Sequence, residues 1–403
     1  MEFRNIFSEV FGLAPKVENL NNIQLVNSYK SYITSYNAEI FNDLTVRTCV
    51  DTIARHVSKL KPSHLLTDDK GRHKQNSNIH TLLTNRPNSY MSTADFLYKI
   101  TSQLLYYGNS FVYIQRNQSG KITGFYPIEY GSAELKEFQS QLFLKFNFQN
   151  GKNFAVPYTD IIHLRRNFSS HELLGQEAYQ PLLDTLTNLA KARQSIANKV
   201  ENGGKISGVL KLAGNIGQQG WLENAKRFVK SFMSSTSDTG GLAAIDSSAE
   251  FIPINIKPES AEDSQLKFLQ QEVYSYFGIT EAIVNGSYDE TQWQAFYEST
   301  IETIKIQLSQ EFTEKIFNQK EKDFGNIIDF NSNRLSYAST TNKVKMVKEL
   351  GSLGLLTTNE ARELFDLAPL EDGDKRLISL NYVNADIADE YQLNKNEDTT
   401  NGN

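Results

Sequence analysis

The sequence predicts an α+β protein, and two patterns lead to that prediction. Several long stretches repeat apolar residues at spacings of three and four, which is typical of amphipathic helices. The stretch from 110 to 164 instead alternates apolar and polar residues, which is typical of antiparallel strands. The chain has 403 residues, 39% of them hydrophobic and 22% charged. It can therefore bury a sizeable core and form two or three structural units.

The longest predicted helix covers residues 178–203 and organises the centre of the chain. Five apolar residues share one face of it: Leu182, Leu186, Leu189, Ile196 and Val200. Gly203 and Gly204 stand where a helix is expected to end. At 1.5 Å per residue such a helix is about 33 Å long, and its apolar stripe must be covered by neighbours.

A small insert and two further helices complete this central stretch. Short strands are predicted at 206–212 and 241–245, and they flank a helix whose apolar face includes Trp221, which makes a β-α-β insert. A second helix is predicted over 258–277, ended by Gly278. A flexible acidic loop at 285–290 follows. A third helix over 292–322 is about 45 Å long if it is unbroken.

The flanking regions contain shorter elements. Helices are predicted at 44–60, and at 94–107 between a cap at Ser92 or Thr93 and a stop at Gly108. Period-two patterns predict strands at 111–114, 122–128, 142–148 and 161–164, with a further short strand at 327–330. Two helices are expected near the C-terminus, at 341–350 and 358–367. Residues 1–40 are expected to form an arm of low order, and residues 377–403 a disordered polar tail.

The charge of the chain is unevenly distributed. The formal net charge is −6, which argues against a basic surface that grips duplex DNA. Residues 258–290 hold seven acids and one lysine, whereas residues 199–230 hold six bases and two acids. The second predicted helix and the loop after it are therefore acidic, and the insert is basic.

No catalytic or metal-binding motif stands out. The chain has no phosphate-binding loop, no nucleophile elbow and no pair of histidines at metal-ligand spacing. Cys49 lies among apolar residues at helical spacing and is predicted to be a core thiol. The sequence 372–374 (DGD) is interpreted as a turn rather than a cation site. These observations favour a structural or assembly protein, with no cofactor and no metal, over an enzyme.

Nothing in the sequence predicts a membrane or secretory protein. No apolar run reaches the length of a membrane helix, and the N-terminus mixes acids into its apolar positions, unlike a signal peptide. The protein is therefore expected in the cytoplasm or in an assembly formed there.

Several segments, in their order, resemble the portal protein family of tailed bacteriophages over residues 41 to 380. These segments are 49–60, 86–88 (RPN), 105–112 with Leu104 before it (LLYYGNSFV), 120–128, 160–165 (DIIHLR), the insert from Gly208, 277–279 (FGI), and 353–362 (LGLLTTNEAR) with Gly373 and Asp374. Proteins of this family form the ring through which DNA enters and leaves the capsid. Thr280 departs from the family, which often has proline there.

The resemblance implies a division of the chain into the parts of a portal subunit. Residues 1–40 form an N-terminal arm outside the match. The parts are then a wing (41–177), a first stem helix (178–203), a clip (204–257), a second stem helix (258–279), a tunnel loop (280–292), a long helix that returns to the wing (293–338), a crown (339–376) and the tail (377–403).

The resemblance also implies site residues. The tunnel loop is expected at Asn285, Gly286, Ser287, Tyr288, Asp289 and Glu290. The channel-lining stem residues are expected to be Glu259, Glu262, Asp263, Lys267 and Glu272. Partner docking is expected at Lys205, Lys211, Trp221, Lys226, Arg227 and Lys230 of the clip. An acidic bore would repel phosphate and let duplex DNA slide, although the same acids are also consistent with an ordinary solvated helix face.

As a portal, the protein would be a ring of twelve copies in the virion, at one vertex of the capsid, assembled in the host cytoplasm. Its partners would be double-stranded DNA, the terminase large subunit, a neck or adaptor protein, and the major capsid and scaffold proteins. Two alternatives remain open at this stage: a metal-dependent nuclease that uses Asp160, Glu172 or Asp372, and a helical scaffold without a channel.

Overall fold

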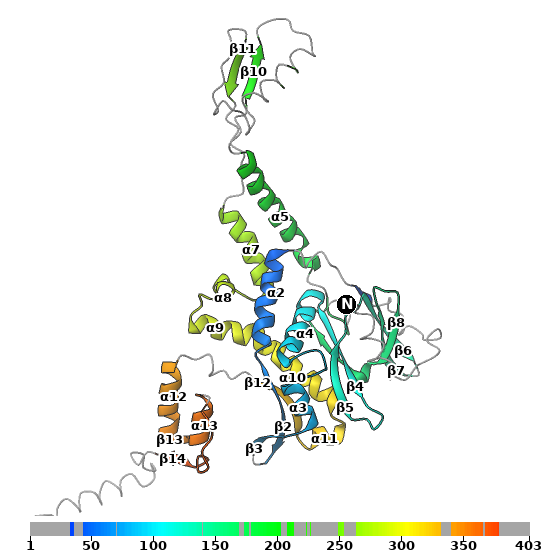
Figure 1. The fold of residues 1–403 in the computed structure, drawn as a ribbon, viewed down its shortest axis with the longest axis vertical. Helices are drawn as coiled ribbons and strands as arrows, with labels where there is room; N and C mark the ends of the chain where they lie inside the picture. The colour runs from blue at the N-terminus through cyan, green and yellow to red at the C-terminus, as the bar shows by residue number, and fades with distance from the viewer. Residues whose placement is uncertain are drawn as a thin grey trace, which may run out of the picture.

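A computed structural model describes most of the chain between residues 33 and 378. The described residues are 33–35, 43–69, 71–138, 140–168, 173–176, 179–202, 208–212, 223, 226, 249–253, 263–331, 340–365 and 367–378. They form a mixed body from which two long helices project (Figure 1). None of the helices in these ranges has both the length and the apolar character that crossing a membrane requires.

The body is built around two helices, α2 (Leu44–Val57) and α4 (Thr93–Tyr107), which pack on each other. The Asp43 carboxylate caps α2 by accepting the backbone N–H groups of residues 45 and 46. Ser92 caps α4 in a reciprocal capping box with Asp95. Gly108 ends α4 with a φ of 68°, where a Cβ would lie 2.1 Å from the carbonyl oxygen of Gln176. Both predicted helices and the glycine stop are confirmed.

Three antiparallel sheets surround these helices. Strand β4 is the centre of a sheet with order β5-β4-β9, and a second sheet has the order β1-β6-β7-β8. The third, β12-β2-β3, joins the start of the body to a strand far along the chain. Their bounds are β1 (Ile33–Ser35), β2 (Lys61–Asp68), β3 (Gly71–Lys74), β4 (Asn109–Arg116), β5 (Ile122–Pro127), β6 (Ser132–Phe138), β7 (Gln141–Asn147), β8 (Asn153–Pro157), β9 (Ile161–Arg165) and β12 (Asn326–Asn331). The strands predicted at 111–114, 122–128, 142–148, 161–164 and 327–330 are confirmed, whereas β1, β3, β6 and β8 were not predicted.

Two short helices lie between these strands. They are α3 (Asn78–Thr84) and the 3-10 turn η3 (Tyr158–Asp160). The main core lies between α2, α4, the β5-β4-β9 sheet and the later helices, and a second core lies between β4 and the β6-β7-β8 strands. Cys49 is fully buried in the main core, and burial raises the pKa of its thiol to about 12. Its prediction as a core residue is confirmed.

The two projecting helices are α5 (Tyr179–Asn202) and α7 (Asp263–Phe277), which we call the stem. They run antiparallel, side by side (Figure 1), and the Thr185 hydroxyl of α5 donates to the Glu272 carboxylate of α7 at 3.2 Å. Beyond their far ends lie β10 (Gly208–Leu212) and β11 (Ala249–Pro253), paired antiparallel. The first stem helix matches its prediction closely. The strand predicted at 241–245 lies outside the described residues, and the observed partner of β10, which is β11, was not predicted.

The helix predicted over 292–322 is present but interrupted, so the length given for an unbroken helix does not apply. It consists of α9 (Glu290–Phe296), a π-helical segment η5 (Tyr297–Ile301) and α10 (Glu302–Ile316). Phe317 then adopts an extended conformation, and its buried ring lies against that of His64. Asn318 caps the separate helix α11 (Gln319–Asp323). Burial of the Phe317 ring and the new cap together explain why the helix stops there.

The C-terminal described residues form a small unit of two helices and two strands, α12 (Thr340–Ser352), β13 (Leu353–Thr357), α13 (Thr358–Glu363) and β14 (Arg376–Ile378). Thr357 and Glu360 make the capping box that opens α13. Helices α12 and α13 were predicted, but α13 is shorter than predicted and the β13–β14 pair was not foreseen. Residues 372–374 form a turn, as predicted.

Candidate functional site

The segment predicted as a tunnel loop is mostly helical. Helix α8 (Glu281–Asn285) ends at Gly286, which has a φ of 72°, and Asp289 caps α9 in a capping box with Gln292. Only residues 286–289 lie between the two helices. The loop expected over 285–290 is thus present over 286–289, one residue shorter at each end, because two helix caps fix its ends. We call residues 281–296 the α8–α9 segment.

An aromatic cluster anchors the α8–α9 segment to the body. Tyr288 stacks on Trp293 with ring centroids 5.4 Å apart, and Trp293 lies 4.8 Å from the ring of His56 on α2. Phe296 contacts both Trp293 and His56. Burial, and then the nearby Lys59 and Arg55, lower the pKa of His56 to about 4, so the imidazole is neutral at physiological pH. Ring packing thus holds the segment against α2.

The acids of the α8–α9 segment remain exposed. Glu281, Asp289 and Glu290 all lie on its solvent-facing surface. In Figure 1 the segment lies on one side of α2, and the sheet with β6, β7 and β8 lies on the other. The segment therefore presents negative charge at the end of the body away from this sheet.

The predicted channel-lining residues of the stem are only partly described. Asp263, Lys267 and Glu272 all lie on α7 and are exposed. Glu272 faces α5, where it accepts the hydrogen bond from Thr185. Glu259 and Glu262 lie outside the described residues.

The predicted docking residues of the clip are described at two positions. Lys211 lies in β10, and Lys226 is an exposed helical residue. The predictions at Lys205, Trp221, Arg227 and Lys230 fall outside the described residues.

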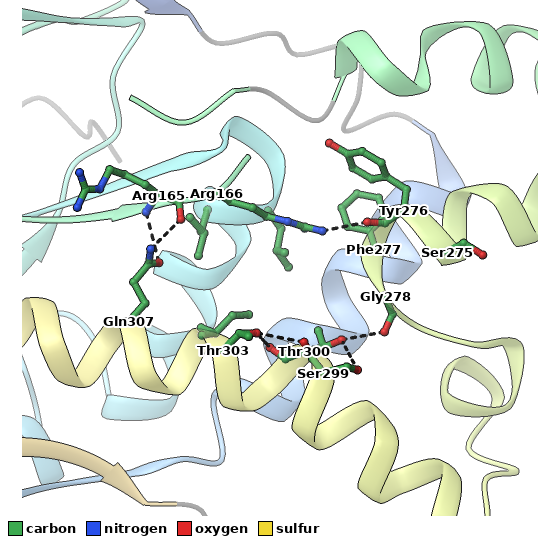
Figure 2. Close-up of a pocket in the computed structure, with 13 residues that line it drawn as sticks. Arg165, Arg166, Ser275, Tyr276, Phe277, Gly278, Ser299, Thr300, Thr303 and Gln307 are labelled. Carbon is green, nitrogen blue, oxygen red and sulfur yellow. Dashed lines mark hydrogen bonds between the residues drawn. The ribbon is translucent and has the colours of Figure 1, made fainter. Parts of the chain in front are cut away.

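A cavity of about 320 Å³ lies where the stem joins the body (Figure 2). It is lined by the ends of α4, β9 and α7 and by the side of η5 and α10. Two consecutive arginines lie there, Arg165 as the last residue of β9 and Arg166 directly after it. The Arg165 guanidinium donates to the Glu311 carboxylate at 3.0 Å, and Gln307 bonds both the N–H and the C=O of Arg165. In Figure 2 the Arg166 side chain runs the opposite way, towards Tyr276.

Arg166 is held by aromatic rings and by one backbone oxygen. Its Nη2 donates to the Tyr276 carbonyl at 3.0 Å, and its guanidinium carbon lies 5.6 Å and 5.4 Å from the ring centroids of Tyr276 and Phe277. Its buried Nη1 has no hydrogen-bond partner. Burial lowers the pKa of Arg166, but a guanidinium stays charged at neutral pH. The base of the stem therefore holds a partly buried, incompletely paired cation.

The two described acids among those considered for a nuclease, Asp160 and Asp372, are not brought together. Asp160, after β8, lies 3.6 Å from Arg116, and burial raises its pKa. Asp372 lies in the C-terminal unit and pairs with Lys375 at 3.1 Å, while Glu172 is outside the described residues. The two described acids thus serve separate ion pairs in different parts of the fold.

Sequence reasoning missed both the cavity and the aromatic anchor. The arginine pair at the end of a buried strand was a weak signal for the cavity, because its other walls come from residues 60 or more positions away. The sequence placed Trp293 on a predicted helix and Tyr288 in the loop before it, but gave no signal of their contact with His56.

The stem, the mixed body and the β10–β11 tip define a class of elongated structural protein. The model of the phage portal protein family matches residues 44–366, well over half of the chain, and the chain belongs to that family. The resemblance inferred from the sequence is thus confirmed. The portal protein of Enterobacteria phage HK97 is 22% identical over 84% of this chain and 82% of its own. That of Escherichia phage T5 is 23% identical over 73% and 72%.

Solved structures share the fold. The neck of a native gene transfer agent particle, computed with C12 symmetry, contains a chain that matches with a TM-score of 0.57 and 15% identity, over 82% of this chain and 92% of the other. A portal protein of the HK97 family from Corynebacterium diphtheriae matches with a TM-score of 0.53 and 12% identity, over 77% and 100%. The α+β portal fold predicted from the sequence is confirmed.

Proposed function

We propose that copies of this chain assemble into a ring of twelve at one capsid vertex, and that double-stranded DNA is packaged and ejected through its bore. The observation that carries this proposal is the stem, whose helices are poorly covered within one chain. Phe268 of α7 is 60% exposed and Leu183 of α5 is 37% exposed. Exposed large apolar residues on a long helix pair favour association with further copies. The C12 symmetry of the related neck structure supports a ring.

In this proposal each part of the chain has a position in the ring. Residues 41–177 form the wing, 178–203 and 258–279 the stem, 204–257 the clip, 280–292 the tunnel segment, 293–338 the return to the wing, and 339–376 the crown. The α8–α9 segment faces the bore and the β6-β7-β8 sheet faces outwards, because they lie on opposite sides of α2 (Figure 1). Neighbouring copies then cover the two broad faces of the subunit.

The α8–α9 segment would form a negatively charged constriction. Twelve copies of Glu281, Asp289 and Glu290, with Asp263 and Glu272 of the stem, would repel the DNA phosphates and prevent tight binding. The aromatic anchor on His56 would keep each segment in position as DNA moves past it.

The remaining partners are assigned by position. The clip, with Lys205, Lys211, Trp221, Lys226, Arg227 and Lys230, would dock the terminase large subunit during packaging and a neck or adaptor protein afterwards. The wing would contact the major capsid and scaffold proteins. The ring would be assembled in the host cytoplasm, remain in the virion, and carry no enzymatic activity of its own.

Particle images of the purified full-length protein test this proposal. We expect class averages with a central hole and, by native mass spectrometry, a mass of twelve chains. Replacement of residues 286–288 by two glycines should leave the rings intact but reduce the number of DNA-filled heads when it is introduced into the phage. Monomers at every concentration would refute the ring, and a normal yield of filled heads would remove the α8–α9 segment from the mechanism.

A further inference from the structure

Arg166 lacks the carboxylate partner that several other arginines in the described part of the chain have. Arg55, Arg116, Arg165 and Arg193 each have a carboxylate within 4.0 Å. No carboxylate among the described residues pairs with Arg166, and its Nη1 is buried without a partner. A buried charge without a counter-charge is costly, so such groups are normally paired. Within one chain, the Arg166 guanidinium therefore has no counter-charge among the described residues and no hydrogen-bond partner for its Nη1.

The space beside Arg166 suits a small polar group. At about 320 Å³ the cavity is at the lower end of the range for ligand sites and is far larger than the roughly 30 Å³ of one water. Hydroxyl groups of Ser275, Ser299 and Thr303 line it together with the guanidinium. The Ser299 and Thr303 hydroxyls already donate to backbone carbonyls, so the guanidinium is the group there that can recognise a carboxylate.

The cavity is continuous with the surface groove of the stem. Ser275 and Tyr276 line both the cavity and a groove between α5 and α7, and the exposed ring of Phe268 lies along that groove. Thr185, Gln271 and Glu272 line the groove as well, so it leads from a mixed apolar and polar surface, which includes one carboxylate of the same chain, to the cation. In the ring proposed above, this surface belongs to the region that a neighbouring copy covers.

Charge complementarity favours a second copy of the chain as the occupant. Residues 258–290 hold seven acids against one lysine, and those described on α7, α8 and the start of α9 are exposed. A neighbour in a ring would bring acids of this kind to every Arg166. We propose that the cavity at the base of the stem binds a carboxylate side chain of the neighbouring copy, with Arg166 as its receptor, so that the site is completed only by assembly. This inference rests on the proposed ring.

Assembly of Arg166 variants tests the inference. Mass photometry of the full-length chain over a concentration series gives the concentration at which half of the chains are in rings. Loss of a hydrogen-bonded charge pair is expected to raise this concentration roughly tenfold or more for Arg166→Gln. Arg166→Lys, which keeps the charge but loses the planar donors, should have a smaller effect. Arg55→Gln, on an exposed arginine paired within α2, is the matched control and should have none.

A second variant separates occupation of the cavity from the packing of Arg166. Ser275→Leu leaves the guanidinium and its aromatic contacts in place but fills the shared mouth of the cavity and groove. It should weaken assembly while leaving the thermal midpoint of the dissociated chain close to that of the wild type. Assembly of Arg166→Gln and Ser275→Leu at wild-type concentrations would overturn the inference while leaving the ring itself intact.

The thermal midpoint of the dissociated chain distinguishes two other occupants of the cavity, a carboxylate of the same chain and a free anion. Glu172 and Glu177 are near Arg166 in sequence. If Glu172→Gln or Glu177→Gln lowers the thermal midpoint in the wild type but not with Arg166→Gln, the carboxylate is intrachain and the inference fails. It also fails if phosphate but not acetate, each compared with chloride at equal ionic strength, stabilises the wild type and not Arg166→Gln, because the site would then take a free phosphate rather than a carboxylate. If the wild type forms no ring at all, the proposed function fails, and this inference fails with it.

Discussion

Helices α4 and α7 have the same length but bury very different parts of their surfaces. Each has 15 residues, yet α4 buries nine of them and α7 only two, Val273 and Phe277. Both buried residues of α7 lie in its C-terminal half, next to the body. The body thus has a continuous core within one chain, whereas the stem has one only where it meets the body.

This difference indicates which contacts each region needs in order to be stable. Burial of apolar surface contributes about 25 cal/mol per Å², so α4 is stabilised mainly within the chain. The outer stem lacks such burial and carries exposed apolar residues such as Phe268. We infer that the body folds as a unit of one chain, and that the stem obtains its remaining contacts from neighbouring copies.

Removal of a large side chain from the body core should have the largest effect on the isolated chain. Phe312 is fully buried, with its ring centroid 5.1 Å from that of Phe330 and 5.6 Å from that of Phe125. Phe312→Ala should lower the free energy of unfolding by about 3–5 kcal/mol, because it removes apolar contacts and leaves a cavity. Urea denaturation of the dissociated chain measures this loss.

Phe324→Ala is the matched control for Phe312→Ala. Phe324 is 76% exposed, so its replacement should change the free energy of unfolding by less than about 0.5 kcal/mol. Equal effects of the two substitutions would show that the body core does not depend on Phe312, and the contrast between body and stem would lose its basis.

The aromatic anchor between the body and the α8–α9 segment should make stability depend on pH. The pKa of His56 is about 4 in the folded chain, against an ordinary value of about 6.5. Between these values the unfolded chain binds a proton more readily than the folded chain does, so stability falls as pH falls from 6.5 to 4. Above pH 6.5 both states are neutral at His56, and this contribution to the pH dependence vanishes. The loss from His56 alone should reach about 3 kcal/mol at pH 4.

A variant without the imidazole isolates this effect. His56→Phe keeps a ring beside Trp293 and Phe296 but cannot be protonated. Its free energy of unfolding should fall less than that of the wild type between pH 7 and pH 4. Parallel pH profiles for the two proteins would show that His56 is not buried in its neutral form, and that the α8–α9 segment is anchored in another way.

Local sequence patterns predicted well those helices and strands whose structure depends on consecutive residues. The apolar spacing in α2, α4 and α5 and the glycine stop after α4 are properties of consecutive residues, and the structure has them as predicted. The break at Phe317 was not predictable in this way. Its ring is buried against His64, which is more than 200 residues earlier, and no local signal encodes that contact.

The candidate sites show the same limit more strongly. The acids of the α8–α9 segment were identified from composition, but the capping box of Asp289 and Gln292, which shortens the loop, was overlooked. Arg165 and Arg166 are adjacent and chemically identical in the sequence. Only the fold gives one of them Glu311 as a partner and places the other between Tyr276 and Phe277. A site built from four separate segments cannot be derived from any one of them.

The smallest effect on the isolated chain is expected at Phe268, and it tests the contrast most directly. Phe268 and Val273 lie on the same helix, α7, but Phe268 is 60% exposed and Val273 is fully buried. Val273→Ala should destabilise the dissociated chain by about 2 kcal/mol, because two buried methyl groups are lost. Phe268→Ala should change it by less than about 0.5 kcal/mol.

The two substitutions should affect ring assembly in the opposite order. Assembly is measured under conditions in which the dissociated chains remain folded. Phe268→Ala removes the exposed ring that a neighbouring copy would cover, so it should raise the concentration needed for half-assembly. Val273→Ala removes only contacts within the chain, so the assembly of its folded fraction should be nearly unchanged. If Phe268→Ala assembles like the wild type, the exposed stem surface is not a contact between copies, and poor burial of the outer stem has another cause.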